Sequence, residues 1–313
     1  MQAIDIKKSF KMTNDKTRNL FYYKALENVE NKVVIDVGSG TGILSAYALH
    51  HGAKFVYAIE RGQKESIIAK KLLGENFDTK KFTVLNKDFW SKDIFTNFQH
   101  DIDILVSETI NYDVIGEGIL KTWRHAKPNV SSHFQCVPNT IQMDALIYKN
   151  PMERFTWLKQ KLQLIPENLL HKGFAKSLHN IHKKVTTSTT QHFMNFPVRD
   201  MVNFNEKVDN VIDISYDKYN GENITFDLTI DCPSLIVLSG KILSGNNILH
   251  LHDPSATTHW SSGLSFYLDT AGTYKVTFIE DASKIKVKSI YLSSSSSLSY
   301  IFKELKILKV FKL

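Results

Sequence analysis

The chain has 313 residues, 42% of them hydrophobic and 23% charged, and it carries a formal net charge of +7. That length can bury the cores of two domains, and the composition lies in the ordinary soluble globular range. No run of about 18 apolar residues and no apolar stretch near the start occurs, so we expect neither a membrane-spanning helix nor a secretory signal. Two cysteines do not make a disulfide framework, which favours a reducing location, cytoplasmic or, in a eukaryote, also nuclear.

The positive charge is compatible with nucleic acid or an acidic protein surface as a partner. The lysines are scattered, however, and no RNA-binding signature with interleaved aromatic residues occurs, so nucleic acid is not indicated. The 12 histidines are dispersed, and neither CxxC nor HExxH is present, so no metal site is predicted. We interpret the charge as a generally solvated basic surface.

Short apolar runs alternate with helical patterns in the first half of the chain. The pattern predicts strands at 32–38, 54–60, 82–86 and 103–108, and helices at 43–52, 63–76 and 114–126. The last of these helices ends before Pro128. Such alternation favours βαβ units and a parallel sheet, with the chemistry at the carboxyl ends of the strands.

The pattern changes after Val137-Pro138. Residues 151–173 have a helical pattern that Pro166 interrupts, and from about residue 180 strand-like stretches punctuated by Gly, Asn and Asp predict an antiparallel β region. We therefore expect an α/β protein of two domains. Residues 1–136 would form an N-terminal helix and a Rossmann-like domain, and residues 137–313 a β-barrel-like substrate domain.

A glycine-rich turn follows the first predicted strand, in VVIDVGSGTGILS. Its spacing, GxGxG, lets the backbone approach a ligand closely, and Glu60 at the end of the next strand offers acceptor oxygens for two ribose hydroxyls. The segment resembles motif I of the class I S-adenosylmethionine-dependent methyltransferases, although a glycine turn in an unrelated α/β protein is the alternative. The resemblance implies S-adenosylmethionine as cofactor, bound around Asp36, Gly38, Gly40, Gly42 and Glu60.

Asp88, in NKDFW, is a weaker candidate for the cofactor site. It would lie near the adenine with Phe89 or Trp90 alongside. An ordinary loop carboxylate explains Asp88 equally well.

Two acids, Glu108 and Glu117, lie on the short segment SETINYDVIGEG. If both face one small site, their repulsion is unfavourable unless a cation lies between them. A guanidinium is such a cation, with five donors in a planar fork and a permanent charge.

The segment resembles the double-E loop of the protein arginine methyltransferases, and three further segments match that family in order. MTNDKTRNLFYY at 12–23 resembles the helix ahead of motif I, the region of Val137-Pro138 resembles the crossing into the barrel, and TTHW at 257–260 resembles the loop that closes over the substrate arginine. The resemblance spans about residues 9–268.

The resemblance implies a role for each matching residue. Arg18 would pair with the methionine carboxylate of the cofactor, and His259 would pair with Asp15, as a proton acceptor or as a support for the loop. Trp260 and Thr258 would contact the substrate. A surface arginine, a loop histidine and a core tryptophan are the ordinary alternatives for Arg18, His259 and Trp260 taken singly.

Within the family, IGEGIL followed by WxHA is most similar to the monomethylating type III branch and its near relatives. Ile119 replaces a methionine typical of asymmetric dimethylation, whereas Met12 matches the other methionine. Ile110 and Asn111 depart from the usual double-E loop. Whether the N-terminal segment closes over the cofactor is left undecided, because the family's covering segment would begin at or before residue 1. With one module, the chain is expected to form a homodimer through a helical arm at 151–173.

The predicted reaction is methyl transfer from S-adenosylmethionine to a guanidinium nitrogen of a protein arginine. Glu108 and Glu117 would hold two N–H groups, so that orientation and electrostatics provide most of the acceleration. Two alternatives remain: an enzyme for free arginine or another small guanidine, and a catalytically silent scaffold with the same fold.

Overall fold

A five-stranded parallel sheet organises the first half of the chain. The computed structural model describes residues 12–111, 114–131, 133–149, 194–197, 204–252, 258, 260, 262–268, 270–281 and 284–292. The sheet has the order β3-β2-β1-β4-β5. Its strands are β1 (Val33–Val37), β2 (Phe55–Ile59), β3 (Phe82–Leu85), β4 (Ile104–Ser107) and β5 (Gln135–Val137).

Continuous burial explains why the central strands form. Every residue of β1 and β4 is buried, as expected for parallel strands covered on both faces. The covering helices are α2 (Lys16–Ala25), α3 (Ile43–His50), α4 (Gln63–Asn76) and α5 (Ile119–Ala126), with short 3-10 turns η1 (Thr79–Lys81), η2 (Ile94–Asn97) and η3 (Lys127–Asn129). The predicted parallel α/β domain is confirmed.

The helix predicted at 114–126 is wrong at its start. The structure begins α5 only at Ile119, because Val114 has a φ of 66° and Gly118 a φ of 99°, and neither value fits a right-handed helix. Residues 114–118 instead form the turn that leads into α5.

The second half forms two antiparallel sheets. One has the order β7-β12-β10-β6-β8 with β11 paired to β10, and the other has the order β14-β13-β9. The strands are β6 (Thr140–Lys149), β7 (Met194–Pro197), β8 (Glu206–Ser215), β9 (Ile224–Ile230), β10 (Ser234–Ser244), β11 (Asn247–His250), β12 (Ser262–Leu268), β13 (Gly272–Asp281) and β14 (Lys284–Leu292). In β9 buried and exposed residues alternate strictly, as expected for a sheet with one solvated face.

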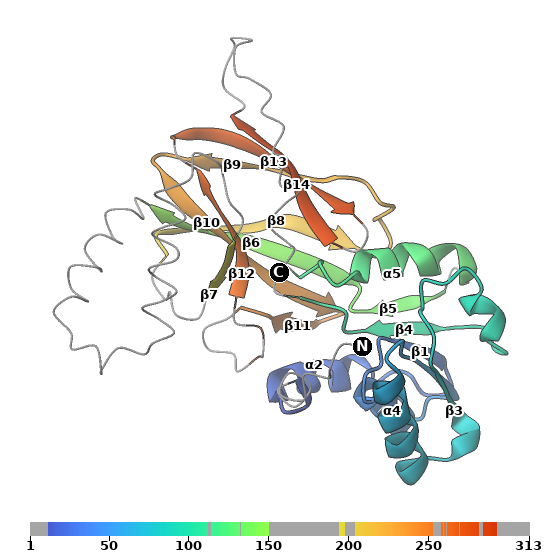
Figure 1. Cartoon of the computed structure of the whole chain (residues 1–313). Coiled ribbons are helices and arrows are strands. Elements are labelled where there is room, and N and C mark those ends of the chain that lie inside the picture. The colour runs from blue at the N-terminus through green and yellow to red at the C-terminus, as the bar shows by residue number, and fades with distance from the viewer. Residues whose placement is uncertain are drawn as a thin grey trace, which may run out of the picture.

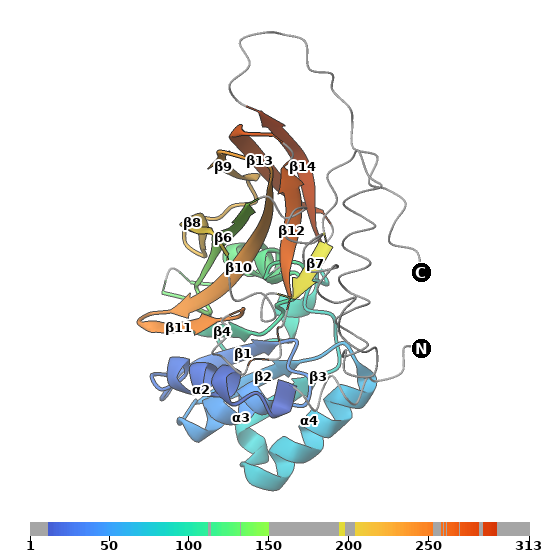
Figure 2. The same cartoon turned by 90° about the vertical axis from the view of Figure 1, so that its left-hand side faces the viewer.

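The antiparallel sheets lie against the α/β half in both views (Figures 1 and 2). The chain crosses between the halves at β5 and β6 through a cis Val137-Pro138 bond. A domain division at 136/137 is compatible with this crossing and stays a prediction. The arm expected at 151–173 lies outside the described residues.

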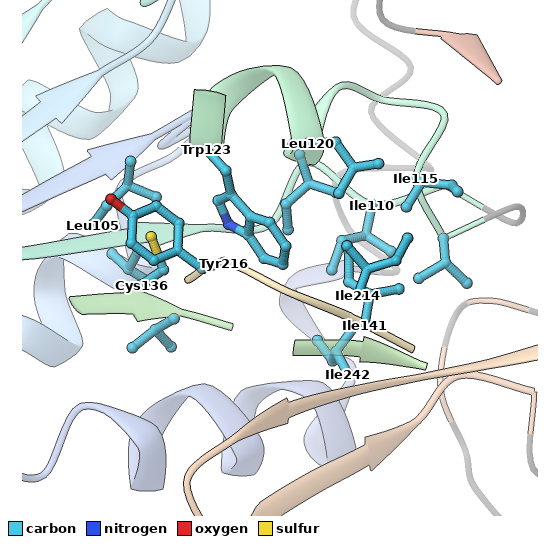
Figure 3. Packing of buried hydrophobic residues seen from close by; sticks show 14 of the residues in the cluster. Leu105, Ile110, Ile115, Leu120, Trp123, Cys136, Ile141, Ile214, Tyr216 and Ile242 are labelled. Atoms are coloured by element: carbon cyan, nitrogen blue, oxygen red, sulfur yellow. The ribbon is translucent and has the colours of Figure 1, made fainter. Parts of the chain in front are cut away.

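A shared apolar core joins the two halves (Figure 3). Ile242, Ile141 and Ile214 lie in register across β10, β6 and β8. They face Leu120 and Trp123 of α5. All five side chains are buried, and a large apolar side chain contributes about 1.5–3 kcal/mol when it is fully buried. We call the segment from Glu108 to Glu117 the acid-bearing loop. The core therefore connects the end of this loop to the strands of the antiparallel sheet.

Candidate active site

The glycine turn between β1 and α3 is built from left-handed backbone. Gly38, Gly40 and Gly42 have φ values of 72°, 54° and 87°. Glycine adopts such values without the steric cost that other residues incur. A Cβ on Gly38 would lie 3.0 Å from Cγ2 of Thr109, whereas no heavy atom of the described residues lies within 4 Å of a Cβ on Gly40. The turn is therefore packed against the segment after β4 at one end and open at its middle.

Glu60 at the end of β2 holds the open side of the turn. Its Oε2 accepts a hydrogen bond from the N–H of Gly40 at 2.9 Å, and its Oε1 accepts one from the N–H of Gly62 at 2.6 Å. A carboxylate has about four lone-pair sites, so each oxygen keeps capacity for a further donor. The half-buried Glu60 can thus fix the loop and still accept hydrogen bonds from ligand hydroxyls.

Asp36 lies beneath the turn and is fully buried. Its Oδ2 accepts hydrogen bonds from the N–H and the hydroxyl of Ser45 at 2.9 and 2.7 Å, while its Oδ1 has no hydrogen-bond partner among the described residues. Burial raises the pKa of Asp36 to about 7, although the bonds from Ser45 act in the opposite direction. Asp36 therefore ties β1 to the first turn of α3.

Arg18 and Glu108 form a buried ion pair at the carboxyl edge of the sheet. Nη2 of Arg18 lies 2.9 Å from Oε2 of Glu108, and the two side chains are only 4% and 3% exposed. Nη1 donates to Oδ1 of Asn19 at 2.9 Å, and Nε has no hydrogen-bond partner among the described residues. Burial lowers the pKa of Arg18, but the carboxylate of Glu108, which also accepts a hydrogen bond from Arg18, outweighs it, so the pKa lies above its usual value.

Asp15 caps the helix that carries this arginine. Its Oδ1 accepts a hydrogen bond from the N–H of Arg18 at 2.9 Å, and its extended backbone interrupts the helical segment ahead of α2. The expected partner, His259, lies outside the described residues, so this pairing stays a prediction.

Tyr22 contributes to the site although sequence reasoning did not single it out. Its hydroxyl donates to the carbonyl of Ser107 at 3.1 Å, and the guanidinium carbon of Arg18 lies 5.4 Å from its ring centroid. The spacing of four residues places Arg18 and Tyr22 on one face of α2, and that spacing is the signal that identifies Tyr22. Ser107 in turn donates to the carbonyl of Val37, so α2, β4 and β1 are linked.

Glu117 lies at the other end of the acid-bearing loop. It is half-buried in the turn directly before Gly118, the N-cap of α5. Glu108 follows β4, so the two candidate acids come from opposite ends of one loop. Ile110, Val114 and Ile115 between them are buried, which anchors the described middle of the loop in the core.

The tetrad from the barrel contacts this loop. Nε1 of Trp260 donates to the carbonyl of Ile110 at 3.1 Å, and Trp260 is buried. The hydroxyl of Thr258 donates to the carbonyl of Leu251 at 2.8 Å. Trp260 therefore contacts the acid-bearing loop, whereas Thr258 is bound to the residue that follows β11. Direct contact of either residue with a substrate stays a prediction.

Asp88 is exposed and caps a turn by accepting the N–H of Trp90 at 2.9 Å. The indole of Trp90 donates to the hydroxyl of Thr122, and the ammonium of Lys121 lies 3.9 Å from the ring centroid. Phe89 packs edge-on against His125. This loop therefore lies along α5, and an adenine contact by Asp88 stays a prediction.

No helix among the described residues is long and apolar enough to cross a membrane. No group of three or more His, Cys, Asp or Glu side chains in these ranges is arranged to hold a metal ion.

Known proteins with similar sequences are arginine methyltransferases. The chain is 31% identical over 193 residues to protein arginine N-methyltransferase 7 of Rattus norvegicus, covering 54% of this chain and 28% of that protein. It is 36% identical over 124 residues to protein arginine N-methyltransferase 9 of Xenopus laevis, covering 39% and 15%. The chain thus spans less than a third of the length of these relatives. No family model matches it.

Solved structures share the fold at low sequence identity. A crystal structure of PRMT6 superimposes with a TM-score of 0.70 at 16% identity, covering 92% of this chain and all of that one. The Trypanosoma brucei PRMT1 enzyme–prozyme complex with AdoHcy superimposes with a TM-score of 0.60, also at 16% identity, covering 91% and 96%. The Rossmann-like sheet with its glycine turn, followed by antiparallel sheets, is the fold that this chain shares with these solved structures. By its sequence, the chain is similar to the protein arginine N-methyltransferases.

Proposed function

We propose that this chain is an S-adenosylmethionine-dependent protein arginine N-methyltransferase. The observation that carries the proposal is the buried Arg18–Glu108 pair at 2.9 Å, beside a glycine turn that is open at Gly40. An arginine methyltransferase needs an anion-binding group for the methionine end of its cofactor and an acid for the substrate guanidinium. Arg18 and Glu108 supply these two opposite charges in direct contact.

The residues around the turn fit S-adenosylmethionine. The open backbone at Gly40 leaves room for a ligand, the remaining lone pairs of Glu60 suit ribose hydroxyls, and the buried Nε of Arg18 is a donor suited to the carboxylate. When bound, the cofactor supplies an electrophilic methyl group on its sulfonium. The hydrogen bonds that Asp36 accepts from Ser45 hold β1 and α3 together beneath this site.

The role of Glu108 follows from its partner. Arg18 occupies one lone pair of Oε2, so Oε1 and the rest of Oε2 remain able to accept N–H groups. Glu108 and Glu117 would hold the substrate guanidinium and draw its positive charge away from the attacking nitrogen. After methylation that nitrogen would release its extra proton to solvent or to His259, the acceptor that the family resemblance implies. Fixed charges that are oriented before the reaction stabilise its transition state at little reorganisation cost.

Separate Glu108→Gln and Glu117→Gln variants test this assignment. We expect both to lose methyl transfer to an arginine-rich peptide, measured by mass spectrometry, while Glu117→Gln keeps its S-adenosylmethionine affinity in calorimetry. Glu108→Gln leaves the buried Arg18 without its counter-charge, so its thermal stability is measured as well. Asp227→Asn, at an exposed position on β9, is the matched control. Full turnover by both site variants would refute the assignment.

The same assay separates the alternative substrates. Free arginine replaces the peptide in a parallel reaction at equal concentration. Methylation of free arginine alone would favour a small-molecule enzyme, and cofactor binding without any turnover would favour a silent scaffold.

We further propose that the chain forms a homodimer through α2 and α4. Leu20 on α2 and Ile67 and Ile68 on α4 are 54%, 62% and 44% exposed, and both helices pack beside α3. A second copy would cover them. We expect Leu20→Asp combined with Ile67→Asp to convert a dimer into a monomer in sedimentation velocity. Ile248→Asp, at an equally exposed position on β11, should leave the dimer intact; a monomeric unmodified chain would refute the proposal.

A further inference from the structure

Val114 lies in the acid-bearing loop in a conformation that its side chain disfavours. Its φ is 66°, in the left-handed region, where a β-branched residue is a genuine outlier. A residue held there costs about 1–3 kcal/mol. Val114 is nevertheless buried, and its N–H donates to the carbonyl of Asn111 at 2.8 Å. The surroundings must therefore hold this part of the loop in place.

Gly240, in the middle of β10, provides the space that Val114 occupies. A Cβ built on Gly240 would overlap Cγ2 of Val114 and lie 3.3 Å from its Cβ. Val114 cannot easily rotate away, because β-branched side chains are stiff about χ1. Gly240 has no left-handed backbone, so the packing of Val114 and not the conformation of the strand requires glycine here.

The backbone of Gly240 is itself held on both sides. Its N–H donates to Nδ1 of His252 at 2.9 Å, and its carbonyl accepts the N–H of Leu251 at 3.0 Å. The carbonyl of Leu251 accepts the hydroxyl of Thr258, next to Trp260, which binds the loop at Ile110. The acid-bearing loop is thus held by two contacts, the packing of Val114 on Gly240 and the hydrogen bond from Trp260 to Ile110. Both contacts are connected to Leu251 through hydrogen bonds of its backbone N–H and carbonyl.

We propose that Gly240 is a positioning residue for the acid-bearing loop. Because Gly240 lacks a side chain, Val114 fits against β10, and this contact fixes the segment whose ends carry Glu108 and Glu117. The barrel would therefore set the spacing of the two acids that the α/β half contributes. This inference rests on the proposed methyl transfer, since only that reaction gives the two acids a joint task.

Gly240→Ala tests the proposal, with Val114→Ala as its rescue. The new methyl group should displace the loop and lower kcat by about 10- to 100-fold, because misplacement by about 1 Å has effects of that size. Affinity for S-adenosylmethionine should stay unchanged, since Gly38, Gly40 and Glu60 are not touched. Val114→Ala removes the overlapping methyl, so the double variant should recover most of kcat.

Asp227→Glu, which adds one methylene at an exposed position of β9, is the matched control. All variants are assayed at least ten degrees below their own Tm, so that a loss of folded enzyme does not enter kcat. Normal kcat in Gly240→Ala, or a double variant as slow as the single one, would overturn the positioning role.

Hydrogen–deuterium exchange separates this inference from the proposed reaction. The N–H of Val114 should exchange faster in Gly240→Ala and return to the original rate in the double variant, whether or not methyl transfer occurs. Unchanged exchange would refute the positioning role alone. If exchange at Val114 is faster in Gly240→Ala and restored in the double variant, but the chain methylates nothing, the proposed reaction is refuted and the positioning role of Gly240 stands.

Discussion

The buried ion pair makes a quantitative prediction about stability. At a separation of 2.9 Å, Arg18 and Glu108 attract each other by about 6 kcal/mol for an effective dielectric constant of about 20. Most of that attraction offsets the desolvation of two buried charges, so the pair adds little net stability. Removing one partner is different, because the other charge then stays buried without compensation. We expect Arg18→Met to lower the free energy of unfolding by about 3–5 kcal/mol.

A double-mutant cycle with Glu108→Gln isolates the interaction. Urea unfolding of the two single variants and of the double variant, without cofactor, should give a coupling of about 1–3 kcal/mol, because the double variant leaves no uncompensated charge. The same cycle at Lys71 and Glu75 is the control, since those side chains are 76% and 62% exposed and lie 3.9 Å apart. That exposed pair should couple by at most about 0.5 kcal/mol. Equal couplings at both sites would refute the reasoning.

Three further predictions concern single side chains. Burial raises the pKa of Asp36 from an unfolded value near 4 to about 7 in the folded chain. The contribution of Asp36 to the free energy of unfolding should therefore be fully present below pH 4 and be lost as the pH rises through 7. Asp36→Asn, which keeps an acceptor for Ser45, should remove this pH dependence in thermal unfolding monitored from pH 4 to 8; an unchanged profile would contradict the assignment. Gly38→Ala should weaken S-adenosylmethionine binding in calorimetry, because it strains a left-handed residue and crowds the segment after β4. An affinity equal to that of the unmodified chain would exclude this cause. Trp260→Phe leaves the carbonyl of Ile110 without its donor and should cost about 1–3 kcal/mol in urea unfolding, and a loss below 0.5 kcal/mol would argue against the bond.

Local sequence patterns predict the parallel sheet well, because each of its central strands is a short apolar run that can be recognised without knowledge of its neighbours in space. β1 and β4 are short apolar runs buried on both faces, and α4 was predicted with the bounds that the structure has. The glycine turn was also predictable, since its left-handed residues at 38, 40 and 42 are all glycine. The positions of Arg18 and Glu108 in one site were predicted only through the family resemblance. Their direct contact across 90 residues has no local signal.

The start of α5 marks where local patterns fail. Apolar residues at helical spacing predict a helix from residue 114, and Val114 carries no sequence signal for a left-handed conformation. The structure resolves the conflict through Gly240, 126 positions later, which gives the valine side chain a place to pack. The strain at Val114 and the missing side chain at Gly240 are thus two parts of one non-local contact. A site whose acids depend on such a contact should be more sensitive to a methyl group at Gly240 than to a larger change at an exposed position of β9.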